Sequence, residues 1–375
     1  MRVFLFSDDL AGRGDVWLNI LWPMYQVYAS CFDTTYLPIP PDQKKVKSHL
    51  AAKIALRKSI IEHRKQLCDS VNKNLSINEP NVLIVWAASA RNVLWTRALD
   101  QVWDKFDHHV LHVCDTMQPN HCPLVLLDRF DLITCFCADL AREFETVLGA
   151  RTLFWPAHLD TLNYHSESDY RPIDLCVVGR RRLELHEPLH RHFNQPGKET
   201  FYLDFVTRTQ PVAPSCEQQF HSLMATYSRS SVSFCYEPGY VPRFKARSPL
   251  LSRWVHAWAS GCTVLGKRPT GTGTADLMDW EDSVIDLPDD PVEAIAEVEA
   301  ILKDTDAMRE RRHRNVLEAI RRHDTRTRIA LTLDALGLEK TASFADELER
   351  LEALEDEVSR AQSGSCSSDT SASSP

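Results

Sequence analysis

Short apolar runs alternate with longer stretches of mixed polarity through the first half of the chain. The clearest run is NVLIVWA, Asn81–Ala87, and the clearest long stretch is His49–Asn74, which carries both signs of charge. Apolar runs of this kind predict buried strands, and the stretches between them predict helices. The predicted strands are Arg2–Phe6, Asp33–Leu37, Asn81–Ala87, His109–Cys114, Leu132–Phe136 and Arg151–Trp155. The helical or amphipathic stretches are Val16–Ser30, His49–Asn74, Asn92–Phe106 and Ala138–Leu148. This alternation favours a doubly wound parallel sheet.

The pattern breaks once and then restarts. His165–Pro172 (HSESDYRP) is polar and contains a proline, which is typical of a linker. A second series of strands follows, at Ile173–Gly179, Phe201–Val206, Val232–Cys235, Thr263–Gly266 and Ser283–Leu287. We therefore expect an α/β fold with two Rossmann-like domains, residues 1–165 and 166–338. A helix over 339–361 and a disordered tail over 362–375 complete the predicted organisation.

Composition narrows the classes of function. The 375 residues are 43% hydrophobic and 25% charged, which is typical of a globular chain of two or three domains. The formal charge of −9 argues against nucleic acid as a partner. No apolar stretch reaches the roughly 18 residues of a membrane helix, and the N-terminal run predicts a strand, not a signal peptide. The cysteines, among them Cys135 and Cys137, show no paired zinc spacing, so we expect reduced thiols, a cytoplasmic location and no metal.

The most informative stretch for chemistry is Arg247–Met278. Ser248 and Pro249 are suited to begin a helix, and Gly261 is suited to end it. Apolar residues recur at helical spacing on one face of this helix. A more polar face carries Ser252, Arg253, His256 and Ser260. The strand CTVLG and a polar loop come next, and such a helix, strand and loop can hold a nucleotide at the end of a sheet.

This stretch resembles the nucleotide-sugar-binding core of group 1, family 4-like, GT-B glycosyltransferases. In that family a helix ends in a pattern like E-A-M-A-x-G, and a strand with C-x-V and a Gly-rich loop follow. The corresponding sequence here is HAWASGCTVLG. The segments DLCVVGRRR, WEDSVIDLPDDPVEA and RRHDTRTRIALTLDALGL are similar to further parts of the same core. The resemblance covers roughly Ile173–Leu338, whereas the N-terminal half is similar only in architecture. It implies two Rossmann-like domains that face each other across a cleft, and transfer of a sugar from a nucleotide diphospho-sugar.

The resemblance also implies where the donor binds. The family often carries two glutamates with seven residues between them on this helix, and the second typically holds the ribose hydroxyls. The matching positions here are Ser248 and His256. His256 can hydrogen-bond a hydroxyl as donor or acceptor, and the alternative is that it only caps a polar helix face. Ser252 and Arg253 join the donor-binding candidates.

Basic residues near the strand ends are candidates for binding the donor diphosphate, because negative charge builds on this leaving group during transfer. Arg180, Arg181 and Arg182 follow the first strand of the second domain. Arg243, Lys245 and Arg247 alternate through PRFKARSP and lead into the helix start at Ser248, which itself favours anions. For each set the alternative is a solvated run of charge.

The acceptor side offers carboxylates and glycines. Asp8 and Asp9 follow the first strand and Asp115 follows the strand His109–Cys114, at positions where such sites lie in parallel sheets. Asp115 is the first candidate for an acceptor-side or basic role, and the alternative is a loop carboxylate or helix cap. Gly12 and Gly14 in LAGRGD are candidates for the glycine loop that group 1 enzymes often carry near the donor.

The sequence therefore predicts a metal-independent glycosyltransferase with no cofactor beyond its nucleotide-sugar substrate. An acceptor glycan, a lipid-linked sugar and a small molecule all fit, and a lipid-linked acceptor would bring the protein to the inner face of the membrane. A nucleotide-sugar epimerase and a catalytically silent GT-B binding protein are the alternatives. The silent form is motivated by the missing helix glutamates.

Overall fold

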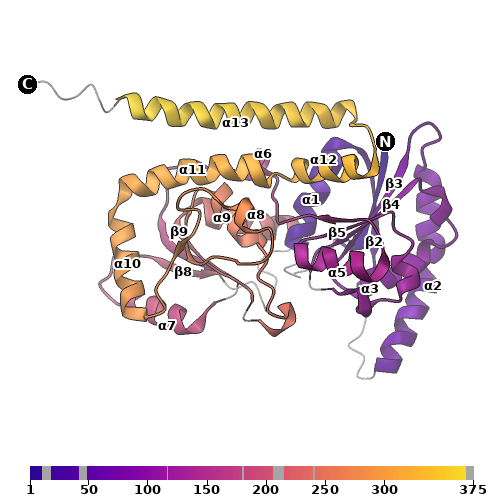
Figure 1. The fold of residues 1–375 in the computed structure, drawn as a ribbon, viewed down its shortest axis with the longest axis horizontal. Coiled ribbons are helices and arrows are strands. Elements are labelled where there is room, and N and C mark those ends of the chain that lie inside the picture. The colour runs from indigo at the N-terminus through magenta and orange to yellow at the C-terminus, as the bar shows by residue number, and fades with distance from the viewer. Residues whose placement is uncertain are drawn as a thin grey trace, which may run out of the picture. The chain divides into compact units, whose positions relative to one another are not determined.

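The computed structural model describes residues 1–10, 18–41, 49–115, 117–179, 181–205, 215–239 and 241–368. The chain forms two compact units (Figure 1). Unit 1 comprises Met1–Pro156 and Ala330–Phe344, and unit 2 comprises Ala157–Ile329 and Ala345–Pro375. Each unit contains its own parallel sheet, so the predicted α/β class with two Rossmann-like halves is confirmed.

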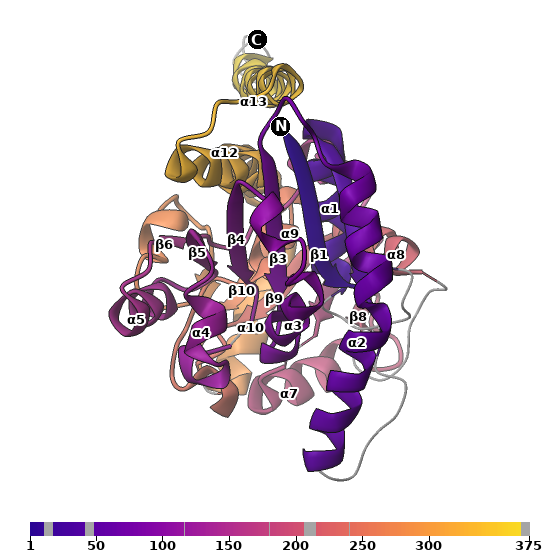
Figure 2. The same cartoon turned by 90° about the vertical axis from the view of Figure 1, so that its right-hand side faces the viewer.

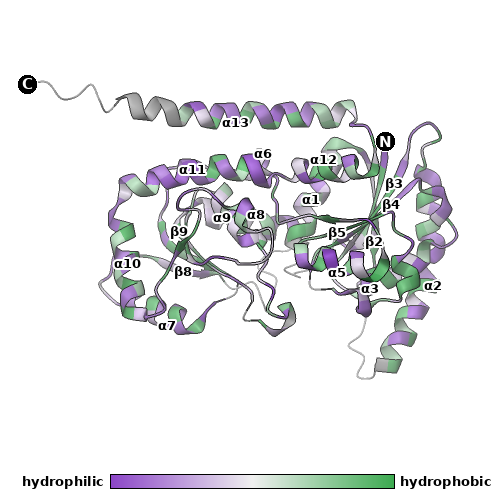
Figure 3. Cartoon of the chain, viewed as in Figure 1, coloured by the Kyte–Doolittle hydropathy of each residue, from purple (hydrophilic) through white to green (hydrophobic). Residues whose placement is uncertain are grey.

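Unit 1 is built on six parallel strands in the order β2-β1-β3-β4-β5-β6. The strands are β1 (Arg2–Asp8), β2 (Asp33–Ile39), β3 (Asn81–Ala87), β4 (His108–Val113), β5 (Leu132–Cys135) and β6 (Thr152–Phe154). Every residue of β3 is buried, as expected of a central strand covered on both faces. In Figure 3 the strands of this sheet are mostly hydrophobic, which explains why the apolar runs located them.

Helices join the strands of unit 1. They are α1 (Leu18–Cys31), α2 (His49–Asn74), α3 (Ala90–Trp95), α4 (Leu124–Leu127) and α5 (Ala138–Leu148). The N-terminal half of α2 extends past the ends of the strands (Figures 1 and 2). The expected amphipathic stretch Asn92–Phe106 is not one helix, because α3 ends at Trp95. Two 3₁₀ turns follow it, η1 (Thr96–Leu99) and η2 (Trp103–Lys105).

Unit 2 holds five parallel strands in the order β11-β10-β9-β7-β8. The strands are β7 (Ile173–Val178), β8 (Tyr202–Phe205), β9 (Ser230–Tyr236), β10 (Thr263–Lys267) and β11 (Ile285–Asp286). The helices are α6 (Thr161–Tyr164), α7 (Leu183–Phe193), α8 (Cys216–Ser228), α9 (Ser252–Ala259), α10 (Pro291–Lys303) and α11 (Thr305–His323). Two more helices complete the chain, α12 (Thr325–Leu336) and α13 (Ala342–Ser368), and α13 continues past the predicted helix end at residue 361.

A buried ionic cluster ties together the two places where the chain enters and leaves unit 2. The Arg326 guanidinium, 1% exposed, donates to Asp160 at 2.9 Å, to Asp324 at 3.3 Å and to Glu347 at 2.8 Å. The Thr161 hydroxyl donates to Asp324 at 2.6 Å. Burying three carboxylates around one arginine carries a large desolvation cost. This cost is offset here because each carboxylate accepts several hydrogen bonds. The cluster therefore fixes segment 160–161 against segment 324–326.

Strand order reverses once in each sheet. In unit 1, β2 lies on one side of β1 and β3 on the other; in unit 2, β8 lies on one side of β7 and β9 on the other. Doubly wound sheets bind ligands at the carboxyl ends of the two strands where the order reverses. The ends of β1 and β3, and separately the ends of β7 and β9, are therefore the places to look for sites.

Candidate functional site

The residues after β7 and β9 meet the requirements of a ligand site in unit 2. Gly179 follows β7 with φ +81°, a conformation that side chains other than glycine rarely adopt. Glu237 follows β9 directly. Since β7 and β9 are paired neighbours, both residues lie at the reversal point of the sheet.

Arg253 brings a cation to the same edge. A Cβ atom built on Gly179 would lie 3.9 Å from Nη2 of Arg253, so the guanidinium lies beside this glycine. Arg253 is the second residue of α9, whose first-turn N–H groups have no partners within the helix. A positive side chain and a helix N-terminus together favour an anion at the end of β7.

Glu237, Ser248 and Thr270 form a hydrogen-bonded set at the end of β9. The Ser248 hydroxyl donates to Oε2 of Glu237 at 3.0 Å, and the Thr270 amide donates to the Ser248 hydroxyl at 3.0 Å. The Gly271 amide donates to the Ser248 carbonyl at 2.7 Å. Ser248 is thereby held between the strand end and the loop after β10, with a carboxylate beside it.

These contacts correct the predicted start of the helix. Ser248 and Pro249 were expected to cap α9, but the helix begins at Ser252, and Leu251 occupies the N-cap with φ −107° and ψ 160°. The physical reason is that the Ser248 side chain and carbonyl are used by Glu237 and by the loop after β10. Gly261, with φ +71°, follows the helix end as predicted.

The predicted polar face of α9 is also wrong in part. His256 is 6% exposed and Ser260 is fully buried. The His256 ring makes edge-on contacts with Phe220 and Tyr227 of α8, with ring centroids 5.8 and 6.0 Å apart. Burial lowers the pKa of His256 to about 4, so its imidazole is neutral near pH 7. His256 therefore packs on α8, and it neither caps a solvated face nor carries a charge.

The basic runs divide between paired and surface positions. Arg181 donates from Nε to Asp204 at 2.9 Å, and Arg182 pairs with Asp289 at 2.8 Å. Lys245 is exposed, in a left-handed conformation with φ +50°, and Arg247 is partly buried. Arg180 lies outside the described residues, and so does the side chain of Arg243. Arg181 and Arg182 are thus each paired with an acid of unit 2.

The reversal point of unit 1 centres on Asp8, which ends β1. Its Oδ1 accepts from Arg91 Nη1 at 2.9 Å, and its Oδ2 accepts from Asn92 Nδ2 at 3.0 Å. Asp9 follows, and its amide donates to the Ile39 carbonyl at 3.1 Å. Asp9 and the Asp8–Arg91 pair therefore share the carboxyl edge of unit 1.

Asp115, the first acceptor-side candidate, lies two residues after β4 and is partly buried. The neighbouring His112 is a core residue: its Nε2 lies 3.2 Å from the Tyr28 hydroxyl, and its ring stacks on Trp155. Burial lowers the pKa of His112 to about 3. Gly12 and Gly14 lie outside the described residues.

Sequence reasoning missed Glu237 and Arg91, and it named Asp8 without predicting its hydrogen bonds to Arg91 and Asn92. The sequence did offer a way to find Glu237, because only Tyr236 separates this carboxylate from the predicted strand Val232–Cys235. Asp8 and Arg91 are 83 residues apart, and only the order of the strands brings them together.

The described parts of the chain lack the features of two other classes of site. No group of three or more His, Cys, Asp or Glu residues there has metal-holding geometry. No helix there has both the length and the apolar character needed to cross a bilayer. The ten cysteines from Cys31 to Cys262 form no disulfide bonds among the described residues, and all but Cys114 are buried.

No protein-family model matches the sequence, and no curated protein matches it. Solved structures do match. The N-terminal domain of trehalose-6-phosphate phosphatase from Candida albicans is 10% identical, with a TM-score of 0.59 over 89% of this chain and 98% of that one. A UDP-forming α,α-trehalose-phosphate synthase from Burkholderia xenovorans is 10% identical, with a TM-score of 0.54 over 91% of this chain and 100% of that one. Alr3699/HepE from Anabaena, in complex with UDP and glucose, is 11% identical, with a TM-score of 0.52 over 90% of this chain and 99% of that one. The chain therefore has the two-domain GT-B glycosyltransferase fold that its sequence predicted.

Proposed function

We propose that this protein transfers a sugar from a nucleotide diphospho-sugar to an acceptor hydroxyl, and that unit 2 binds the donor. The observation that carries the proposal is the position of Arg253 beside Gly179, with Glu237 on the neighbouring strand, at the reversal point of the unit 2 sheet. A cation at a helix N-terminus is what a diphosphate requires. Similar structures with the same fold contain UDP and glucose or UDP-2-fluoro glucose, so UDP-glucose is the first donor we assign.

The reaction needs charge compensation on the leaving group. The bond between the sugar C1 and the β-phosphate oxygen breaks, a bond from C1 to the acceptor oxygen forms, and the hydroxyl proton leaves with the nucleoside diphosphate. The departing diphosphate gains negative charge, which Arg253 and the N–H groups at the start of α9 can stabilise. Because these groups belong to the protein, we propose that the transfer requires no tightly bound metal.

Glu237 supplies a carboxylate that the helix itself lacks. Ser248 occupies the position of the first family glutamate, and Oε2 of Glu237 lies 3.0 Å from its hydroxyl. We assign contacts with the donor hydroxyls to Glu237, since a carboxylate accepts two such hydrogen bonds. His256 packs on α8 and is not assigned this role.

We assign the acceptor to unit 1, where Asp8, Asp9 and Asp115 lie at the carboxyl edge. One similar structure is a trehalose-6-phosphate synthase described as transferring with retention, and we extend that outcome to this chain. In a retaining enzyme the donor phosphate can take the acceptor proton, so Asp115 would orient the hydroxyl rather than act as an obligatory base.

A silent binding protein is the second candidate. Neither helix position that matches a family glutamate is a carboxylate here, and His256 is turned toward α8. Such a protein would bind the donor and leave it intact. Binding and turnover therefore have to be measured separately.

The test is release of UDP from UDP-glucose in the presence of candidate acceptor sugars. Arg253→Gln should lower kcat/KM by roughly 100-fold or more, because a charge-assisted contact to the diphosphate is lost. Arg309→Gln is the matched control, since Arg309 lies on α11 and pairs only with the exposed Asp306. Equal rates for the wild type and Arg253→Gln would overturn the assignment. Donor binding without any turnover would favour the silent protein.

A further inference from the structure

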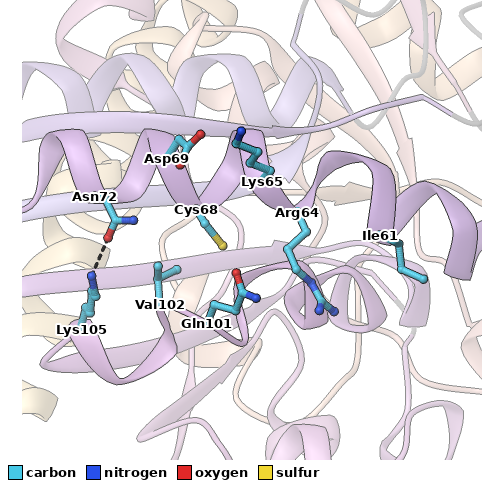
Figure 4. Close-up of a pocket in the computed structure, with 9 residues that line it drawn as sticks. All are labelled: Ile61, Arg64, Lys65, Cys68, Asp69, Asn72, Gln101, Val102 and Lys105. Atoms are coloured by element: carbon cyan, nitrogen blue, oxygen red, sulfur yellow. Dashed lines mark hydrogen bonds between the residues drawn. The ribbon is translucent and has the colours of Figure 1, made fainter.

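A second polar pocket lies in unit 1, away from the strand ends described above. It is an open pocket with a volume of about 370 Å³, between α2 and the segment that contains η2 (Figure 4). Asn72 lies near the end of α2, just before β3, and Lys105 lies just before β4. The pocket is therefore at the amino side of the sheet, whereas Asp8 and Arg91 are at the carboxyl edge.

The pocket is positively charged although the chain as a whole is acidic. Its lining carries three cations, Arg64, Lys65 and Lys105, and one acid, Asp69. Figure 4 shows Lys65 and Asp69 together on one side, at i,i+4 spacing on α2, so these two charges offset each other. Arg64 and Lys105 remain toward the two ends of the pocket.

Two acids close in sequence to the lining residues pair with cations that do not line the pocket: Asp100 with Arg129 at 2.8 Å, and Glu62 with Lys58 at 3.7 Å. Asp104, next to Lys105, is exposed, so solvent screens its charge. The lining itself therefore keeps an excess of positive charge.

The Arg64 guanidinium has N–H groups available to donate hydrogen bonds to a ligand. Its Nη2 donates to the Arg97 carbonyl at 3.3 Å. A guanidinium has five N–H donors, so this one hydrogen bond leaves further donors for an anion in the pocket. Burial raises the pKa of the Cys68 thiol on the pocket floor, and the charge of Arg64 opposes this rise, which is consistent with Arg64 lying close to the floor.

The remaining lining indicates what the ligand carries besides its anionic group. Val102 is buried and offers an apolar wall, and Gln101 and Asn72 offer amide groups that bind hydroxyls. Lys105 is held in place by Asn72, whose Oδ1 accepts its ammonium at 2.6 Å. Pockets for small organic molecules begin at about this size.

We propose that this pocket binds a small organic phosphate monoester. The phosphate lies against Arg64, and its hydroxyl-bearing carbon skeleton extends along Val102 toward Asn72 and Lys105. This inference is independent of the donor site in unit 2, and it gives unit 1 a second site besides the acceptor edge.

The test is isothermal titration of the full chain with sn-glycerol 3-phosphate, with glycerol as the uncharged comparison and inorganic phosphate as the comparison without a carbon skeleton. The monoester is expected to bind saturably. Inorganic phosphate should bind more weakly, and glycerol should not bind. Arg64→Gln should weaken binding about tenfold or more, since one charge-assisted contact is lost. Lys105→Gln should also weaken it, and melting curves establish that each variant is folded.

Two controls locate the bound monoester. Lys53→Gln changes an exposed cation on α2 that does not line the pocket, and it should bind as the wild type does. Arg253→Gln should also leave binding of the monoester unchanged, even where it abolishes nucleotide binding. The proposal is overturned if no saturable binding occurs, if Arg64→Gln and Lys105→Gln both bind as the wild type, or if Arg253→Gln alone removes binding.

Discussion

Burial is the main determinant of the protonation of three core histidines, His112, His256 and His323. Burial is the largest cause that lowers the pKa of His256 to about 4 and the pKa values of His112 and His323 to about 3. Each ring stacks on or abuts an aromatic side chain, such as Trp258 beside His323. These histidines are therefore neutral core residues near pH 7, and protonating them disfavours the folded state.

The stability of the protein should consequently fall as the pH is lowered. An unfolded histidine takes up a proton near pH 6.5, whereas His256 in the folded state does so only near pH 4. Between these values the unfolded state binds more protons, so protonation favours unfolding by up to roughly 1.4 kcal/mol per pH unit for each such group. Urea unfolding at pH 7 and pH 5 should show this loss.

His256→Gln isolates the contribution of one ring. The variant should lose less stability than the wild type between pH 7 and pH 5, whatever its stability at pH 7. His221→Gln, at an exposed position of α8, is the control and should keep the wild-type dependence. Equal pH dependence for the wild type and His256→Gln would show that the ring is not held neutral by burial.

At the scale of single residues the sequence pointed to the segment in which we propose the donor site, but not to every residue of that proposed site. Arg253 and Ser248 were predicted because they lie in the segment that resembles a donor site. Glu237 was missed although it lies close after a predicted strand, because it is eleven positions before Ser248 and only the folded loop brings their side chains within 3.0 Å. His256 was placed on a polar face because its neighbours at helical spacing are polar, whereas α8 covers that face.

Among the elements, β10 depends on a glycine for its place beside β9. Gly266 has φ +140°, and a Cβ atom at this position would lie 2.0 Å from the carbonyl oxygen of Cys235. No rotamer relieves a clash between a Cβ atom and the backbone. The close approach of β9 and β10, which sets the position of the loop after β10, therefore requires glycine here.

Gly266→Ala should destabilise unit 2 by more than about 2 kcal/mol, because both strain and a backbone shift are needed to admit the methyl group. Gly197→Ala is the matched control: its φ of +87° is equally unusual, but no atom lies within 4 Å of the added Cβ. The control should cost about 1–2 kcal/mol from backbone strain alone. Chemical unfolding of both variants measures the difference, and similar losses would show that the clash is relieved by small movements.

Regular elements were predictable where local signals act without competition. The bounds of β3, α2 and α5 are those the sequence predicted, since apolar runs, helical spacing and a left-handed Gly149 cap agree there. The start of α9 was not, because Glu237 and the loop after β10 compete for the groups of Ser248. Tertiary hydrogen bonds thus moved the helix start by about one turn.

For the molecule as a whole, the two units share one topological plan. In each sheet the second strand lies on one side of the first and the third strand on the other, so each has one reversal point. The sequence predicted alternating strands and helices but could not give this order, because strand order follows from long-range packing. The order is what brings Asp8 to Arg91 in unit 1 and Gly179 to Glu237 in unit 2.

The central claim is that the carboxyl edge of unit 2 binds a nucleoside diphosphate. A thermal-shift screen of the full chain against UDP, GDP, ADP and TDP and their common sugar conjugates tests it most directly. Ligand at about 100 times its Kd stabilises the folded state by about 2.7 kcal/mol, so UDP and UDP-glucose should raise the Tm by several degrees. Arg253→Gln and Glu237→Gln should reduce this shift, and Arg309→Gln should retain it. No shift with any nucleotide, or an undiminished shift in Arg253→Gln, would contradict the claim.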